Sequence, residues 1–88
     1  MKTIHKYELP IGPFTLELPT GAEFLSVQAQ AGLAQSWWLV ETGASTSRRA
    51  FVVYGTGHEV RDEPRRFLGT FQLQGGAFVG HLFEVPLS

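Results

Sequence analysis

The sequence predicts an all-β protein, a small antiparallel β-sandwich or barrel of about seven short strands. Three observations predict this class. Short runs in which apolar and polar residues alternate recur along the chain, turns rich in glycine and proline separate them, and no segment shows the periodicity of an amphipathic helix. The 88 residues, 43% of them hydrophobic, are enough for a single β domain over residues 1–88 with a modest core.

Four strands are expected in the first half of the chain. A strand over residues 2–9 ends at residues 10–13, which contain two prolines and a glycine. Residues 14–18 alternate strictly, and Pro19-Thr20-Gly21 then turns the chain. Residues 25–30 alternate again. Ala31-Gly32 is expected to form a two-residue hairpin turn into a strand over residues 33–41.

Three more strands are expected in the second half. Residues 42–47 are small and polar and predict a connection. Residues 49–54, rich in aromatic and β-branched side chains, predict a strand that Gly55-Thr56-Gly57 ends. Residues 61–66 carry charges and a proline, which is typical of an exposed loop. Residues 67–73 and 77–85 form the clearest hairpin, closed by residues 74–76.

Adjacent large apolar residues indicate that both faces of the sheets are covered. Trp37 and Trp38 are neighbours in an expected strand, so their side chains must point to opposite faces. Either two layers cover both faces, or an apolar strip stays exposed until another molecule covers it. We expect the second alternative, with the strip covered in a homo-oligomer, a dimer or higher. Five further aromatic residues are assigned to the core: Tyr54, Phe67, Phe71, Phe78 and Phe83.

Composition excludes several classes of protein. The chain has no cysteine, which rules out disulfides, thiolate metal sites and a cysteine nucleophile and suits a reducing cytoplasm. The N-terminal residues do not resemble a signal peptide, and no apolar run is long enough to span a bilayer. The net charge of -1 argues against non-specific nucleic-acid binding and against a polybasic membrane surface. We therefore expect a soluble, cytoplasmic protein.

Arginines gather near one glycine-rich turn. Five of the seven cationic residues are arginines between positions 48 and 66, and a guanidinium binds phosphate or carboxylate as a planar fork. The glycines of the turn allow backbone N–H groups to approach an anion, and a tryptophan can stack on a base. The predicted ligand-binding residues are Arg48, Arg49, Gly55, Thr56, Gly57, His58, Arg65 and Trp37 or Trp38.

A purely structural interpretation of these residues competes with the binding site. The turn lacks the complete phosphate-loop and dinucleotide patterns, and its glycines can simply permit a tight turn. The arginines lie among Glu59, Asp62 and Glu63 and can form solvent-exposed ion pairs. This interpretation also extends to the histidines, for which we expect no metal, because the spacing of His5, His58 and His81 matches no ligand pattern. His81 alternates with Val79 and Phe83 on an expected inward face, as a satisfied, partly buried histidine.

Six segments of the chain together form a recognisable pattern: residues 6–10, 14–19, 25–28, 55–58, 69–73 and 79–84. In order and spacing they resemble an uncharacterised family of short proteins encoded by tailed bacteriophages and prophages. The resemblance implies a phage protein made inside a bacterial cell, and it implies no activity or catalytic residues.

Three functions follow, in order of preference. The first is a phage-encoded host-takeover or anti-defence factor that sequesters a phosphorylated, nucleotide-like small molecule in an oligomer pocket. The second is a protein–protein interaction module, either an inhibitor of a host protein or an accessory component of the virion, that uses an exposed tryptophan and a sheet edge. The third is a small hydrolase, which the scattered carboxylates and serines favour least, and we expect neither catalytic residues nor a cofactor.

Overall fold

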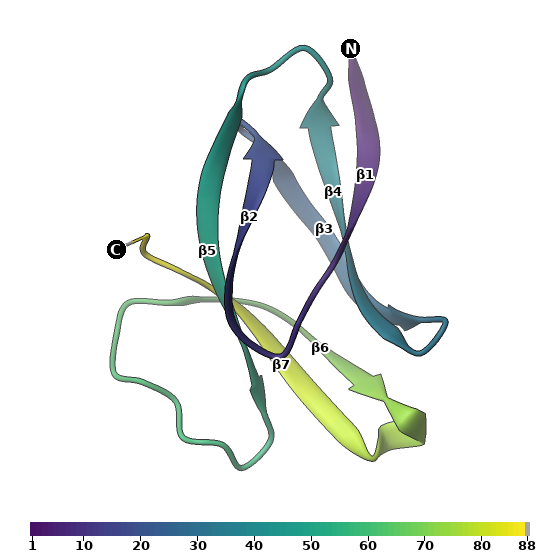
Figure 1. The fold of residues 1–88 in the computed structure, drawn as a ribbon, viewed down its shortest axis with the longest axis vertical. Coiled ribbons are helices and arrows are strands. Elements are labelled where there is room, and N and C mark those ends of the chain that lie inside the picture. Colours follow the sequence, from purple (N-terminus) through teal and green to yellow (C-terminus); the bar gives the residue numbers. More distant parts are fainter. Residues whose placement is uncertain (88) are drawn as a thin grey trace.

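The chain forms a two-layered antiparallel β-sandwich (Figure 1). The computed structural model describes residues 1–87, and the predicted all-β class is confirmed. The helical element of these residues is a 3₁₀ turn, and no helix among them is long and apolar enough to cross a membrane. The strands are β1 (Lys2–Glu8), β2 (Gly12–Pro19), β3 (Glu23–Gln30), β4 (Leu33–Glu41), β5 (Thr46–Gly55), β6 (Arg66–Leu73) and β7 (Phe78–Val85), with η1 (Gln74–Gly76) between the last two.

Local sequence signals placed the strands correctly and their ends less well. The turn between β3 and β4 has positive φ at both Ala31 (53°) and Gly32 (80°), the backbone that a tight two-residue hairpin requires, so that prediction is confirmed. Strand β5 starts at Thr46, inside the expected connection, because Thr46 pairs with Pro19 of β2. Pairing across the sheet thus extends the strand into residues with no strand pattern of their own.

The two sheets meet closely along one side only. One sheet has the order β1-β4-β3 and the other β2-β5-β7-β6. Strand β3 lies against β6, so closely that a Cβ on Gly69 would be 2.7 Å from Cγ1 of Val27. On the opposite side of the sandwich are the edge strands β1 and β2, joined by residues 9–11. The molecule therefore has one closed flank and one open flank.

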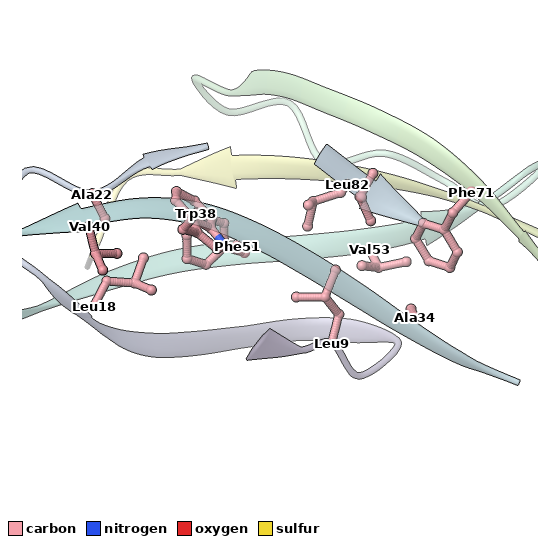
Figure 2. Packing of buried hydrophobic residues seen from close by; sticks show 11 residues of the cluster. Leu9, Leu18, Ala22, Ala34, Trp38, Val40, Phe51, Val53, Phe71 and Leu82 are labelled. Carbon is pink, nitrogen blue, oxygen red and sulfur yellow. The ribbon is translucent and has the colours of Figure 1, made fainter. Parts of the chain in front are cut away.

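The core is built around Trp38, which is fully buried (Figure 2). Its ring contacts Phe51 and Phe24 edge-on, at centroid distances of 5.7 and 5.3 Å. The buried indole N–H donates to the Oγ of Ser36 (2.9 Å), and that hydroxyl donates to the carbonyl of Tyr7 (3.0 Å). The indole N–H, which is the one polar group of the Trp38 side chain, thus has a hydrogen-bond partner close by, and this offsets the cost of burying it.

The assignment of these five aromatic residues to the core is wrong in part: Tyr54, Phe67, Phe71, Phe78 and Phe83. Phe71 is buried and Phe78 packs against the core cluster, as expected. The register of β5, β6 and β7 places Tyr54, Phe67 and Phe83 on the outer face of the four-stranded sheet, and Phe67 is 57% exposed. This face therefore carries apolar side chains that the second layer does not cover.

Candidate functional site

Strand β5 divides the predicted site between two faces of the sheet. Because side chains alternate, Arg49 points toward the same side as the buried Phe51 and Val53, whereas Arg48 points outward together with Val52 and Tyr54. Adjacent arginines in one strand cannot grip the same small anion. The two therefore belong to different surroundings.

Arg48 lies at a hollow of about 530 Å³ on the outer face of β2 and β5, a volume within the range of small-molecule sites. The loop between β5 and β6 borders it, as do the residues that follow β7. Its apolar lining includes Ala50, Val52, Val85, Pro86 and Leu87, and its polar lining includes Thr15, Arg48, Tyr54, Arg61 and Glu63.

The polar groups of the hollow come from a strand and from the loop that follows it. The Nε of Arg48 is 3.4 Å from a carboxylate oxygen of Glu17, and both side chains are more than half exposed (61% and 58%), so this ion pair is weak. The backbone N–H of Arg61 donates to the Tyr54 hydroxyl (3.2 Å), which holds the loop against the strand. Arg48, Tyr54 and Arg61 therefore line the same hollow as its apolar residues.

Arg49 has a structural role at the mouth of the core. Its guanidinium donates to both carboxylate oxygens of Glu84 (2.7 and 2.8 Å) and to the Ala22 carbonyl (2.8 Å), and it lies 5.0 Å from the centroid of the Trp38 ring. The hydrogen bond to Glu84 raises the pKa of Arg49 above the ordinary value of an arginine, although burial opposes the shift. The side chain is 25% exposed. This clamp joins β5, β7 and the turn before β3.

The glycine-rich turn uses its own backbone donors. The N–H of Gly55 donates to Nδ1 of His58 (3.1 Å), that of Thr56 to the Val79 carbonyl (3.1 Å), and that of His58 to the Gly55 carbonyl (3.0 Å). A Cβ on Gly55 would lie 2.7 Å from the His58 ring and 2.9 Å from the Phe78 ring. The glycine is needed for this close packing, and the turn does not present its amides as a cradle for an anion.

His81 is held between two threonine hydroxyls. Its Nε2 is 2.7 Å from Oγ1 of Thr56 and its Nδ1 is 3.0 Å from Oγ1 of Thr70. The expected inward orientation of His81 is wrong, because its neighbour across the sheet is Tyr54 on the outer face. A neutral imidazole donates through one nitrogen and accepts through the other, so the cluster ties the turn, β6 and β7 together.

The comparison with protein families decides where this chain belongs. Residues 1–88 match the domain of unknown function DUF7352. The chain belongs to this family. No curated protein and no solved structure matches the DUF7352 chain.

In the DUF7352 chain the predicted ligand-binding residues do not come together. Arg48 lines the hollow, whereas Arg49 belongs to the core clamp and Gly55, Thr56, Gly57 and His58 form the turn. Arg65 donates to the Glu63 carbonyl within its own loop (3.2 Å). Trp38 is fully buried, so no ligand can stack on it, and Trp37 is half-buried on the outer face of the three-stranded sheet. Among residues 1–87, no group of three or more histidine, cysteine or acidic side chains is arranged to hold a metal ion.

Sequence reasoning missed the other residues of the hollow. The sequence assigns Tyr54 to the core and Val85 to a strand, and it gives no signal for residues 86 and 87. The two-residue period of β5 could have placed Arg48 and Tyr54 on one face and Arg49 on the other. No sequence pattern could show that β2 pairs with β5 or that the C-terminal residues border the same face.

Proposed function

We propose that this DUF7352 protein is a phage- or prophage-encoded binding protein that captures a phosphorylated, nucleotide-like small molecule in the cytoplasm of a bacterial host. It acts by stoichiometric sequestration, as a host-takeover or anti-defence factor. The resemblance to short proteins of tailed bacteriophages supports the origin. The absence of cysteine from the sequence supports a reducing compartment.

One observation carries the binding function: Arg48 and Arg61 line the same hollow beside the Tyr54 side chain. Two guanidinium groups suit a phosphate, because each donates in a fork that matches the phosphate oxygens. The apolar floor and the phenol ring suit the flat, less polar part of a nucleotide. Glu63, on the same hollow, is an acceptor for hydroxyl or amino groups of such a ligand.

The polar groups of the hollow favour binding over turnover. Catalysis of phosphoryl or acyl transfer needs a positioned nucleophile or general base beside the bound anion. Within the described lining, the hydroxyls are Thr15 and Tyr54 and the carboxylate is Glu63, and no hydrogen bond joins this carboxylate to either hydroxyl. Binding without turnover is therefore the function that this geometry supports best.

Isothermal calorimetry with a panel of nucleoside mono-, di- and triphosphates and cyclic nucleotides tests the proposal. The double variant Arg48→Ala/Arg61→Ala should raise the Kd of any bound nucleotide by about 100-fold or more, because each charge-assisted hydrogen bond contributes about 1.5–3 kcal/mol. The matched control is Arg66→Ala, which removes a charge that lies outside the hollow. Arg49 is unsuitable for this test because its replacement would disturb the core clamp.

Two outcomes would contradict the assignment. The first is an equal loss of affinity in the Arg66→Ala control, since that would mean a general effect of charge. The second is no binding across the whole panel by calorimetry and by native mass spectrometry. If a host protein then co-purified in stoichiometric amount, and Phe67→Ser abolished its capture, the exposed aromatic face would support the protein–protein module instead.

A further inference from the structure

Strand β1 presents a row of outward-facing backbone groups on the open flank. In its pairing with β4, the N–H of Leu9 donates to the Ala34 carbonyl and the N–H of Thr42 donates to the Met1 carbonyl. The register is continuous between these points, so the odd-numbered residues of β1 hydrogen-bond to β4. The backbone N–H and C=O groups of the even-numbered residues therefore point away from the sheet: Lys2, Ile4, Lys6 and Glu8.

The three other edge strands carry features that discourage pairing. Strand β2 contains Pro13 and Pro19, which have no N–H to donate. Strand β3 has a bulge at Leu25 and β6 has one at Leu68, and these two strands lie against each other. Strand β1, in contrast, keeps an unbroken register over all its residues and contains no proline. It is the edge best suited to accept another strand.

The second layer does not obstruct this edge. Thr3 and His5 pair with Val40 and Trp38, so they lie on the face of the sheet that covers the core. Both side chains are nonetheless exposed, so the four-stranded sheet does not bury them. In Figure 1, β1 lies beside β4 at the outer flank of the sandwich. A strand from a second molecule can therefore approach.

We propose that β1 of a second copy of this chain pairs antiparallel with β1, with His5 on the two-fold axis. This register overlaps the two strands completely and gives a six-stranded sheet across the dimer. Each Lys2 then lies opposite Glu8 of the partner subunit, so two pairs of opposite charge form. Every outward backbone group of β1 gains a partner. The proposal specifies the interface of the homo-oligomer that the sequence predicts, and it does not depend on the small-molecule site.

Charge also selects this register against its neighbours. A shift that brings Ile4 onto the axis places Lys2 opposite Lys6 of the partner subunit, twice. A shift that brings Lys6 onto the axis places the two copies of Lys6 opposite each other. Like charges directly opposite destabilise an antiparallel pair. The sequence of β1 thus favours complete overlap.

Single cysteines test the register, since the chain has none of its own. Across the dimer, the two copies of residue 5 form a non-hydrogen-bonded pair with Cα atoms roughly 4.5 Å apart, which a disulfide can bridge. His5→Cys should therefore form a disulfide-linked dimer under mild oxidation, seen by non-reducing electrophoresis. The matched control Thr3→Cys should stay largely unlinked, because its two copies lie roughly 13 Å apart along the strand.

Charge reversal tests the pairing without new bonds. By sedimentation velocity the wild type should be a dimer of twice 9.7 kDa. Lys2→Glu and Glu8→Lys should each weaken dimerisation by about tenfold, and the exchange Lys2→Glu/Glu8→Lys should restore it. Circular dichroism checks that each variant is folded. A monomeric wild type, equal cross-linking of the two cysteine variants, or an exchanged variant no better than either single one would overturn the proposal.

Discussion

The adjacent residues Arg48 and Arg49 have different surroundings because successive side chains of a strand point to opposite faces of the sheet. Arg48 points into solvent at the hollow and makes one long ion pair with Glu17. Arg49 points toward the core, where a carboxylate, a carbonyl and an indole ring surround its guanidinium. Identical chemistry therefore contributes to a surface site at one position and to the stability of the fold at the next.

Replacing Arg49 should destabilise the protein far more than replacing Arg48. We expect Arg49→Ala to lower the free energy of unfolding by about 2–3 kcal/mol, since it leaves Glu84 partly buried without its partner. Arg49→Lys should recover only part of this, because an ammonium cannot donate as a fork. Arg48→Ala should change stability by no more than about 0.5 kcal/mol. Urea denaturation measures all three, and equal effects at both positions would contradict the clamp.

The shifted pKa of Arg49 also fixes a pH dependence. A raised pKa means that the folded state favours the charged guanidinium, so the stabilisation is complete below the ordinary pKa of an arginine and is lost only at higher pH. The stability difference between Arg49→Ala and the wild type should therefore be constant between about pH 7 and pH 9.

At the scale of elements, glycines let neighbouring strands accommodate aromatic rings. Gly80 in β7 pairs with Phe71 in β6, and a Cβ on Gly80 would lie 2.5 Å from the Phe71 ring. Phe71 is itself buried in the core, so its ring has little room to move. The absence of a side chain at Gly80 is thus part of the packing of the hairpin.

Gly80→Ala should lower the free energy of unfolding by about 1–3 kcal/mol through overpacking. Gly43→Ala is the matched control, because a Cβ there meets no atom within 4 Å and the backbone has ordinary φ. Phe71→Leu replaces the ring by a smaller side chain and makes room for the new methyl group. The double variant Gly80→Ala/Phe71→Leu should therefore lose less stability than the sum of the losses in the two single variants. Thermal unfolding of the four proteins measures this coupling, and strict additivity would argue against the contact.

The whole molecule is a sandwich closed on one flank and open on the other. Contact between β3 and β6 closes the first flank, and the second ends in β1 and β2. Most of the large, fully buried side chains, Trp38, Phe51 and Leu82 among them, come from the interior strands β4, β5 and β7, and Leu18 comes from the edge strand β2. Stability should therefore be greatest in these three strands.

Native-state hydrogen exchange should show this order directly. Amides of β4, β5 and β7 are bonded between strands on both sides, so they should exchange only through global unfolding. Amides of the edge strands should exchange faster, through local fraying. Slowest exchange in β2 or β3, measured by NMR in deuterated buffer, would contradict the arrangement of the core.

The sequence by itself determined the all-β class, the seven strands and the turn at Ala31-Gly32. It also determined that Trp37 and Trp38 face opposite ways. These features depend on alternation and turn chemistry, which are properties of a few consecutive residues. They are therefore visible before any long-range contact is known.

Only the tertiary structure decided which faces became core and which residues met. Tyr54, Phe67 and Phe83 are aromatic residues of the kind found in protein cores, yet they lie on a face that the second sheet does not cover. Arg49 met Glu84 because β5 pairs with β7, and Arg48 met Arg61 at one hollow because the loop after β5 folds back over β5. Such pairings join residues far apart in the chain. The burial free energy of the whole sandwich selects them, and no local pattern encodes that quantity.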